Sequence, residues 1–204
     1  MKYDLYAFDF DLTIADTLEA SIINYKDALS EVGLSFDEKN IFTELGKSLD
    51  QTFKELNEMT GSSEASQRCE QAFYRSVEKN FHIVKLYDEV ENAIVRLKNN
   101  GKKVAVITNR RRDAVDMVLK RYPSLKGLID YFSTSDVSDK LKPLPDPIFA
   151  ALEALGVKKE ETLFIGDAKN DEICADSAGV DFIYMDRYGL IESEKKITSL
   201  NELF

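Results

Sequence analysis

Five short apolar runs that alternate with helical stretches constrain the fold of this chain more than any other feature. The runs occupy residues 3–8, 104–107, 131–134, 163–165 and 182–185. They are rich in β-branched and aromatic residues, as strands are. Strands that alternate with helices along a chain favour a parallel sheet covered by helices. The sequence therefore predicts an α/β protein with a parallel, five-stranded core sheet flanked by helices.

The helical stretches between these runs carry start and stop signals. Asp88 and Glu91 form a capping-box pattern at the start of one such stretch. We expect helices over about 88–101, 146–156 and 170–179, each of which ends at a glycine.

Residues 16–82 interrupt the alternation, because they show helical periodicity without a strand. Helices are expected there at about 16–33, 37–46, 48–61 and 63–81. We therefore predict two domains. Residues 1–15 and 83–204 form the α/β core with its Rossmann-like sheet, and residues 16–82 form a four-helix cap domain inserted after the first strand.

Composition and charge exclude several classes of partner. The net charge of −10 at pH 7 disfavours nucleic acid and anionic membranes. The apolar runs fall short of a membrane span, and the first residues lack a signal-peptide layout. Cys69 and Cys174 fit neither a disulfide framework nor a zinc site, and we expect both to be core residues in a reducing compartment. We expect a cytoplasmic protein that is a monomer or homodimer.

Polar residues directly follow three of the predicted strands. Asp9 and Asp11 follow the first strand, Thr108 and Asn109 follow the second, and Asp167 follows the fourth. Ligands of open parallel sheets bind beyond the carboxyl ends of the strands. These side chains are therefore expected to converge on one rim.

Two acids at one strand end are unfavourable unless a cation or protons neutralise them, and catalysis gives a reason to keep them. A carboxylate such as Asp9 can attack phosphorus. A second acid, Asp11, can protonate a leaving alkoxide and then activate water. The alternative for residues 9–13 is a turn held by local side-chain hydrogen bonds.

The candidate phosphate-binding groups lie in two other segments. The hydroxyl of Thr108 and the backbone N–H groups around Asn109 would bind phosphate oxygens, although a solvated strand end fits these two residues equally well. Lys142 could be one of many surface lysines. However, three prolines between 143 and 147 stiffen its loop and can aim its ammonium inward.

The segment 166–171 contains two more candidate metal ligands, Asp167 and Asp171. A hard cation such as Mg²⁺ prefers oxygen ligands from one or two carboxylates, together with phosphate and water. Asp9 and Asp167 on neighbouring strands could supply these carboxylates. The alternative is a strand end followed by a helix cap, with Asp171 close to the positive end of the helix dipole.

Taken in order, these segments resemble the four motifs of the haloacid-dehalogenase-like (HAD) hydrolase superfamily. The segments are Asp9-Phe10-Asp11-Leu12-Thr13, Thr108-Asn109, Lys142-Pro143 and Gly166-Asp167-Ala168-Lys169-Asn170-Asp171. The resemblance covers the whole chain, because the helical insert looks like the first-type cap of this family. The stretches 142–147 and 175–179 resemble the phosphoglycolate phosphatase subgroup.

The resemblance implies a phosphatase that acts on a small phosphorylated metabolite through a phospho-aspartate intermediate. Asp9 would be the nucleophile and Asp11 the acid/base. Thr108, with Asn109 beside it, would bind the phosphoryl group. Lys142 would neutralise charge on Asp9 and on the phosphate.

The resemblance also implies that Mg²⁺ is held by Asp9, the backbone carbonyl of Asp11 and Asp167, with Asp171 in support. One position departs from the family pattern, because Leu12 stands where a glycine is usual. The backbone at Leu12 is therefore expected to avoid positive φ or to be supported by packing.

Two other functions remain open. A phosphomutase of the same fold is the nearest enzymatic alternative. The threonine at position 13 slightly favours hydrolysis over this alternative. A non-catalytic binding protein on this scaffold would be expected to lack a motif residue, and none is missing. A dehalogenase is disfavoured, because a halide does not need the acid that Asp11 supplies.

Three further features have alternative interpretations. The loop of Gly46, Lys47 and Ser48 resembles the specificity loop of similar caps, so Lys47 is a candidate substrate-binding residue; an ordinary interhelical turn fits equally well. The run 110–112 is interpreted as a solvated helix start, from which one arginine could reach an anionic substrate. His82 is expected to be structural or exposed.

Overall fold

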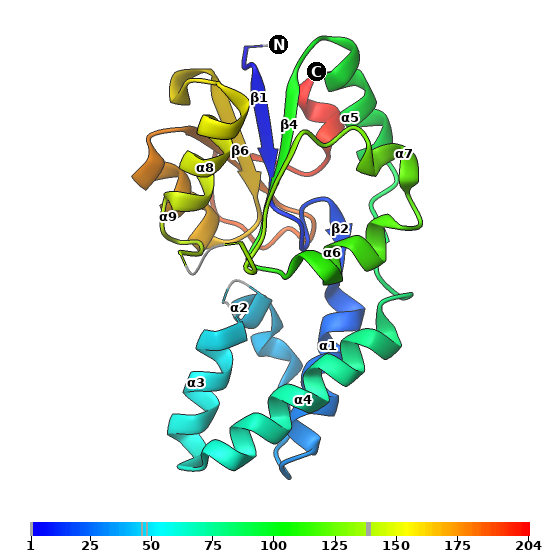
Figure 1. The fold of residues 1–204 in the computed structure, drawn as a ribbon, viewed down its shortest axis with the longest axis vertical. Helices are drawn as coiled ribbons and strands as arrows, with labels where there is room; N and C mark the ends of the chain where they lie inside the picture. The colour runs from blue at the N-terminus through cyan, green and yellow to red at the C-terminus, as the bar shows by residue number, and fades with distance from the viewer. Residues whose placement is uncertain (1, 46, 48, 138–139) are drawn as a thin grey trace. The chain divides into compact units, whose positions relative to one another are not determined.

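A computed structural model describes residues 2–45, 47, 49–137 and 140–204, and it divides the chain into two compact units (Figure 1). One unit comprises Met1–Asp16 and Leu86–Phe204, and the other comprises Thr17–Lys85. The cap domain expected from the sequence spans 16–82. Within the described residues, no helix has the length and apolar character needed to cross a membrane.

The first unit is built on a parallel sheet, which has six strands among the described residues. The order is β5-β4-β1-β6-β7-β8. The strands are β1 (Leu5–Phe8), β4 (Lys103–Ile107), β5 (Tyr131–Ser133), β6 (Thr162–Gly166), β7 (Asp181–Met185) and β8 (Lys196–Ile197). The α/β class and the parallel sheet are confirmed. The strand number was wrong, because the two-residue β8 is too short to leave a periodic pattern in the sequence.

A second, two-stranded sheet pairs β2 (Ala15–Asp16) with β3 (Lys85–Leu86). Both strands have only two residues, and neither was predicted from the sequence. They occupy the points where the chain leaves the first unit and returns to it.

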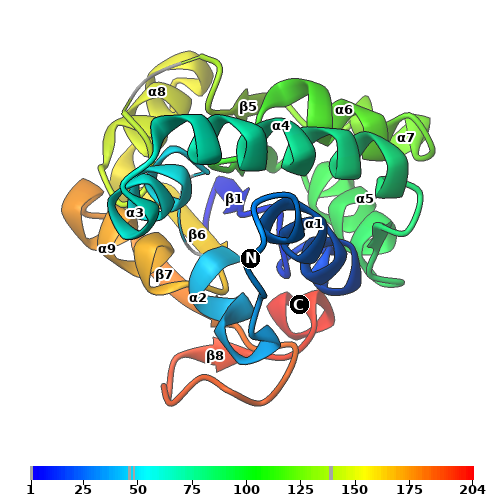
Figure 2. The same ribbon diagram turned by 90° about the horizontal axis from the view of Figure 1, so that it is seen from below.

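Helices cover both faces of the core sheet. Those of the first unit are α5 (Val90–Asn99), α6 (Arg112–Leu119), α7 (Pro123–Lys126), α8 (Asp146–Leu155) and α9 (Lys169–Ala178), with 3₁₀ turns η2 (Lys159–Glu161) and η3 (Leu200–Leu203). Figures 1 and 2 show α8 and α9 on one face and α5 on the other. The α8–α9 face buries apolar side chains of β1, β4 and β6, including Leu5, Ile107 and Phe164, against Ile148 and Ala175.

The predicted capping box at the start of α5 is wrong. The helix is capped at Glu89, which makes no capping hydrogen bond through its side chain. Glu89 instead forms an ion pair with Arg187, with 2.5 Å between Oε1 and Nη1. The ends of α8 and α9 match the prediction, because Gly156 and Gly179 each follow the last turn with positive φ.

The second unit is helical. It contains α1 (Leu18–Ser30), η1 (Glu38–Asn40), α2 (Ile41–Leu45), α3 (Leu49–Thr60) and α4 (Ser63–Asn80). Its core is an aromatic cluster in which Tyr25, Phe53 and Phe73 are buried. The structure has a 3₁₀ turn followed by the short α2 where a single helix was expected over 37–46. The Asp37 side chain caps the 3₁₀ turn, since it accepts a hydrogen bond from the backbone N–H of Lys39.

Candidate active site

The loop that follows β1 carries the first pair of acids. Asp9 extends β1, since its backbone N–H donates to the carbonyl of Ile165 at 2.8 Å, and the residue is 5% exposed. The chain then turns tightly: the N–H of Leu12 donates to the carbonyl of Ala15, and the N–H of Ala15 donates to the carbonyl of Phe10. The turn places Asp11 beside Asp9 at the carboxyl edge of the sheet.

Leu12 adopts positive φ, at +52°. The expectation that this non-glycine backbone avoids positive φ is therefore wrong, and the other expectation, support by packing, is confirmed. Leu12 is only 2% exposed, so burial of its side chain offsets the steric cost of the left-handed conformation.

Arg187 fixes the far end of this loop. Its Nη2 donates to the carbonyl of Thr13 at 2.7 Å, while the Thr13 hydroxyl donates to Oδ1 of Asp167 at 3.4 Å. The guanidinium carbon lies 3.9 Å from the centre of the Tyr87 ring. Because Arg187 is held by its ion pair with Glu89 as well, the loop has a rigid support.

Lys142 is buried between two carboxylates. Its Nζ lies 2.5 Å from Oδ1 of Asp9 and 2.6 Å from Oδ1 of Asp171. Burial alone would lower the pKa of Lys142, but the attraction of Asp171 and Asp9 outweighs it and raises the pKa above its ordinary value. The ammonium therefore stays charged beside the strand end of β1.

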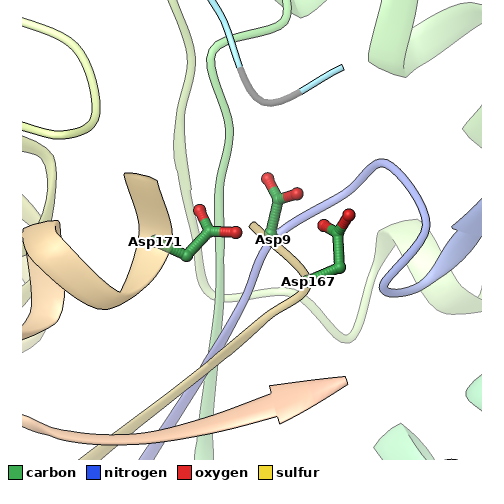
Figure 3. Close-up of side chains that lie close together, drawn as sticks. All are labelled: Asp9, Asp167 and Asp171. Carbon is green, nitrogen blue, oxygen red and sulfur yellow. The ribbon is translucent and has the colours of Figure 1, made fainter. Parts of the chain in front are cut away.

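Asp9, Asp167 and Asp171 form a carboxylate cluster, in which one oxygen from each side chain lies within 4.8 Å of the others (Figure 3). They come from the end of β1, the end of β6 and the first turn of α9. Burial raises the pKa of Asp9 to about 7, although Lys142 opposes the shift. Burial, and then the charges of Asp9 and Asp171, raise the pKa of Asp167 well above its ordinary value.

The cluster has the properties expected of a divalent-cation site. Three carboxylates face one ammonium, so negative charge is in excess. Oδ1 of Asp171 is buried, and it shares the ammonium of Lys142 with Asp9. A hard cation would satisfy such an oxygen and offset the excess charge. These residues therefore fit Mg²⁺.

Gly166 makes the cluster sterically possible. A Cβ atom at this position would lie 2.5 Å from Oδ2 of Asp171. The same Oδ2 accepts a hydrogen bond from the N–H of Ala168 at 3.0 Å, which fixes the Asp171 carboxylate over the glycine. Glycine at the end of β6 is thus required for close approach rather than for positive φ.

The turn after β4 contacts the loop that carries Lys142. Thr108 is 4% exposed, and its Oγ1 accepts a hydrogen bond from the N–H of Arg110 at 3.1 Å. Both ends of the Asn109 amide bind the backbone of Lys142: Nδ2 donates to its carbonyl at 2.9 Å, and Oδ1 accepts from its N–H at 3.0 Å. The Asn109 side chain therefore holds the lysine loop in place.

Arg110 contacts Asp11 through two hydrogen bonds. Nε donates to Oδ2 at 3.0 Å, and Nη2 donates to Oδ1 at a shorter distance. Neither this pair nor the contact of Asn109 with Lys142 was predicted from the sequence. The only signal was the arginine that directly follows the polar end of a strand.

The remaining sequence candidates lie in the helical unit. Lys47 is paired with Glu44 and Glu55, at N–O distances of 2.9 and 2.7 Å. Its neighbours Gly46 and Ser48 lie outside the described residues. His82 contacts the carbonyl of Lys79 through Nδ1 at 3.0 Å. The substrate-binding role of Lys47 stays a prediction.

Carboxylates and a lysine thus meet at the carboxyl edge of a parallel sheet. The chain matches the sequence profile of the haloacid dehalogenase-like hydrolases over residues 6–185. It belongs to this family, and the predicted resemblance is confirmed. The prediction of an enzyme of the phosphatase type is confirmed as well.

Known relatives support the assignment. The chain is 30% identical to the pyrophosphatase PpaX of Bacillus mycoides over 182 residues, which are 88% of this chain and 81% of that protein. Its fold is similar to that of a protein from Bacteroides fragilis named as a haloacid dehalogenase-like hydrolase, with a TM-score of 0.86, 22% identity and full coverage of both chains. A protein from Haemophilus somnus named as a predicted phosphoglycolate phosphatase gives a TM-score of 0.87 at 20% identity, with coverage of 100% and 97%.

Proposed function

We propose that the chain is a Mg²⁺-dependent phosphatase that hydrolyses a phosphate monoester of a small metabolite, of the phosphoglycolate or sugar phosphate type, through a phospho-aspartate intermediate. The observation that carries the proposal is the buried Asp9 carboxylate, held by Lys142 within a cluster of further carboxylates. A carboxylate so placed is a fixed nucleophile, and its neighbours are suited to a cation and a phosphate.

In the first step, an oxygen of Asp9 attacks phosphorus and the ester P–O bond breaks. Asp11 gives its proton to the leaving alkoxide oxygen. Thr108 binds a phosphoryl oxygen, and Lys142 stabilises the negative charge on Asp9 and on the phosphoryl group. The Asn109 amide contributes by holding the backbone of Lys142.

In the second step, Asp11 takes a proton from water as the water oxygen attacks phosphorus. The aspartyl P–O bond then breaks, which restores the Asp9 carboxylate and releases phosphate. Asp9, the backbone carbonyl of Asp11 and Asp167 would hold Mg²⁺, with Asp171 supporting it. The ion would supply positive charge for the phosphoryl oxygens.

Pyrophosphate hydrolysis is a second candidate function, favoured by the 30% identity to proteins named pyrophosphatase. It uses the same residues, since the attacked atom is again phosphorus, and it differs only in the leaving group. We further propose a cytoplasmic enzyme, monomeric or homodimeric, that acts on small soluble substrates.

The test is phosphate release from a panel that contains 2-phosphoglycolate, sugar phosphates, nucleotides and pyrophosphate, with and without Mg²⁺. Asp9→Asn is the matched control, because the amide is nearly isosteric and is a poor nucleophile. We expect at least one substrate to be turned over with Mg²⁺ by the native protein and not by the variant. Formation of an isomeric phosphate without free phosphate would indicate a mutase, and equal activity of Asp9→Asn would exclude the covalent mechanism.

A further inference from the structure

We propose that Arg110 is a positioning residue of the reaction, whose guanidinium holds the Asp11 carboxylate in the orientation needed to take the proton of water in the second step. This inference rests on the proposed function, in which Asp11 is the acid/base. It assigns a role to a residue outside the four sequence motifs.

The geometry of the pair is that of a two-point contact. Nε and Nη2 of Arg110 each donate to a different oxygen of Asp11, as in a bidentate contact between a guanidinium and a carboxylate. The side chains are only 19% and 15% exposed, which limits screening by water. Two parallel hydrogen bonds fix the rotation of a carboxylate, whereas a single ammonium contact leaves it free to turn.

Arg110 is itself anchored to the sheet. Its N–H donates to Oγ1 of Thr108 at 3.1 Å, and its carbonyl accepts from the N–H of Ser135 at 3.1 Å. Its guanidinium carbon lies 6.0 Å from the centre of the Phe10 ring. The arginine therefore connects the backbone after β4 to the side chain of the loop after β1.

The surroundings of Asp11 explain why it needs such a partner. Its charge repels the carboxylates of Asp9 and Asp167, since it contributes to the upward pKa shifts of both. Without a fixed cation, repulsion would favour rotation of the Asp11 side chain away from the reacting atoms. Arg110 offsets this repulsion at Asp11, whereas Lys142 contacts Asp9 and Asp171.

The experiment compares Arg110→Met, Arg110→Lys and Asp11→Asn with the double variant Arg110→Met/Asp11→Asn. The matched control is Arg111→Met, which removes a neighbouring arginine paired with the exposed Asp113. Turnover of 2-phosphoglycolate and of para-nitrophenyl phosphate, or of the best substrate of the panel, is measured with Mg²⁺. Thermal unfolding of each variant and phospho-enzyme captured by rapid quench complete the set.

We expect Arg110→Met to lower kcat by about 10²-fold with little change in KM, as misplacement of a reacting group does. Arg110→Lys should recover part of the loss, because it keeps the charge without the two-point contact. Phospho-enzyme should accumulate in Arg110→Met with the aryl phosphate, since its hydrolysis needs Asp11. In the Asp11→Asn background, Arg110→Met should have no further effect, and Arg111→Met should behave like the native protein.

Three outcomes would overturn the inference. A raised KM that persists in the Asp11→Asn background would make Arg110 a substrate-binding residue. A loss of activity that follows only the fraction of folded protein would make it structural. If Arg110→Met has native kcat while Asp11→Asn is impaired, Asp11 does not depend on Arg110 for its position. Native kcat for Asp11→Asn itself would instead contradict the proposed acid/base, whatever Arg110 does.

Discussion

At the scale of single residues, Gly166 determines whether the carboxylate cluster can form. An added methyl group would overlap the carboxylate of Asp171 and force it to move. We predict that Gly166→Ala weakens Mg²⁺ binding by about 10-fold or more, as disruption of a supporting carboxylate does. The measurement is the Mg²⁺ dependence of activity.

The control for Gly166→Ala is Gly127→Ala, at the end of α7. A Cβ there would meet its nearest atom, the carbonyl oxygen of Ser124, at an ordinary 3.6 Å. Gly127→Ala should leave the Mg²⁺ dependence unchanged. Equal effects of the two substitutions would contradict the steric explanation.

Leu12 is the opposite case to Gly166, because it carries a large side chain at a backbone conformation that favours glycine. Leu12→Gly would relieve about 1–2 kcal/mol of left-handed strain. It would also remove a fully buried leucine, and truncation to alanine alone costs about 2–5 kcal/mol. We predict that the lost packing outweighs the relieved strain, so the free energy of unfolding falls by about 1–3 kcal/mol in urea denaturation.

Leu12→Ala is the companion variant. It loses the same packing and keeps the strain, so it should be less stable than Leu12→Gly by about 1 kcal/mol. If the alanine variant is the more stable of the two, the positive φ of Leu12 carries no strain.

At the scale of the elements, the turn after β4 holds the loop before α8 through Asn109. Asn109→Ala removes two hydrogen bonds to the backbone of Lys142 and leaves its N–H and carbonyl without these partners. We predict a kcat about 10-fold lower and a free energy of unfolding about 1–3 kcal/mol smaller. Steady-state kinetics and chemical denaturation would measure both.

Asn100→Ala is a suitable control, because Asn100 also bonds to a backbone carbonyl, that of Arg96, but at an exposed helix end. Asn100→Ala should leave both kcat and the free energy of unfolding nearly unchanged. A native kcat for Asn109→Ala would show that the loop holds Lys142 without help from the asparagine.

The elements also show where sequence reasoning succeeds and fails. Apolar, β-branched runs such as 104–107 identify strands, because burial on both faces leaves a continuous apolar signature. The two-residue strands β2, β3 and β8 have no such signature, since backbone pairing alone defines them. The strand-end rule brought Asp9 and Asp167 together, because it depends only on sheet topology.

The side-chain pairings could not be predicted in the same way. Arg110 reaches Asp11 from a different strand, and Asn109 reaches Lys142 across 33 positions of sequence. Both contacts depend on the side-chain conformations and on the shape of the loops. No periodic pattern in the sequence indicates these two side-chain contacts. The loop conformation at Leu12 was open for the same reason.

At the scale of the whole molecule, the carboxylate cluster couples stability to pH and metal. The pKa of Asp9 is raised to about 7 in the folded protein. An aspartate in an unfolded chain has a pKa of about 3.9. Between these values the folded state binds more protons than the unfolded state. In the absence of metal, the contribution of Asp9 to stability is therefore lost as the pH rises from about 4 to about 7.

We predict that millimolar Mg²⁺ raises the melting temperature by several degrees near neutral or higher pH, and by less near pH 5, where protons compete for the carboxylates. Differential scanning fluorimetry measures the shift, with NaCl of equal ionic strength as the control. Asp167→Asn should abolish most of it. A shift that is independent of pH, or equal with NaCl, would contradict binding at this cluster.

The position of β1 in the middle of the sheet has a consequence for how the chain reaches its folded state. Its neighbours are β4, which begins at Lys103, and β6, which begins at Thr162. As the chain is synthesised, β1 is made before both of its neighbours, and one of its edges stays unpaired until β6 has emerged. Contacts so distant in sequence close slowly. A nascent chain that stops before β6 exposes an apolar strand edge, the kind of surface on which chaperones act and from which aggregates grow.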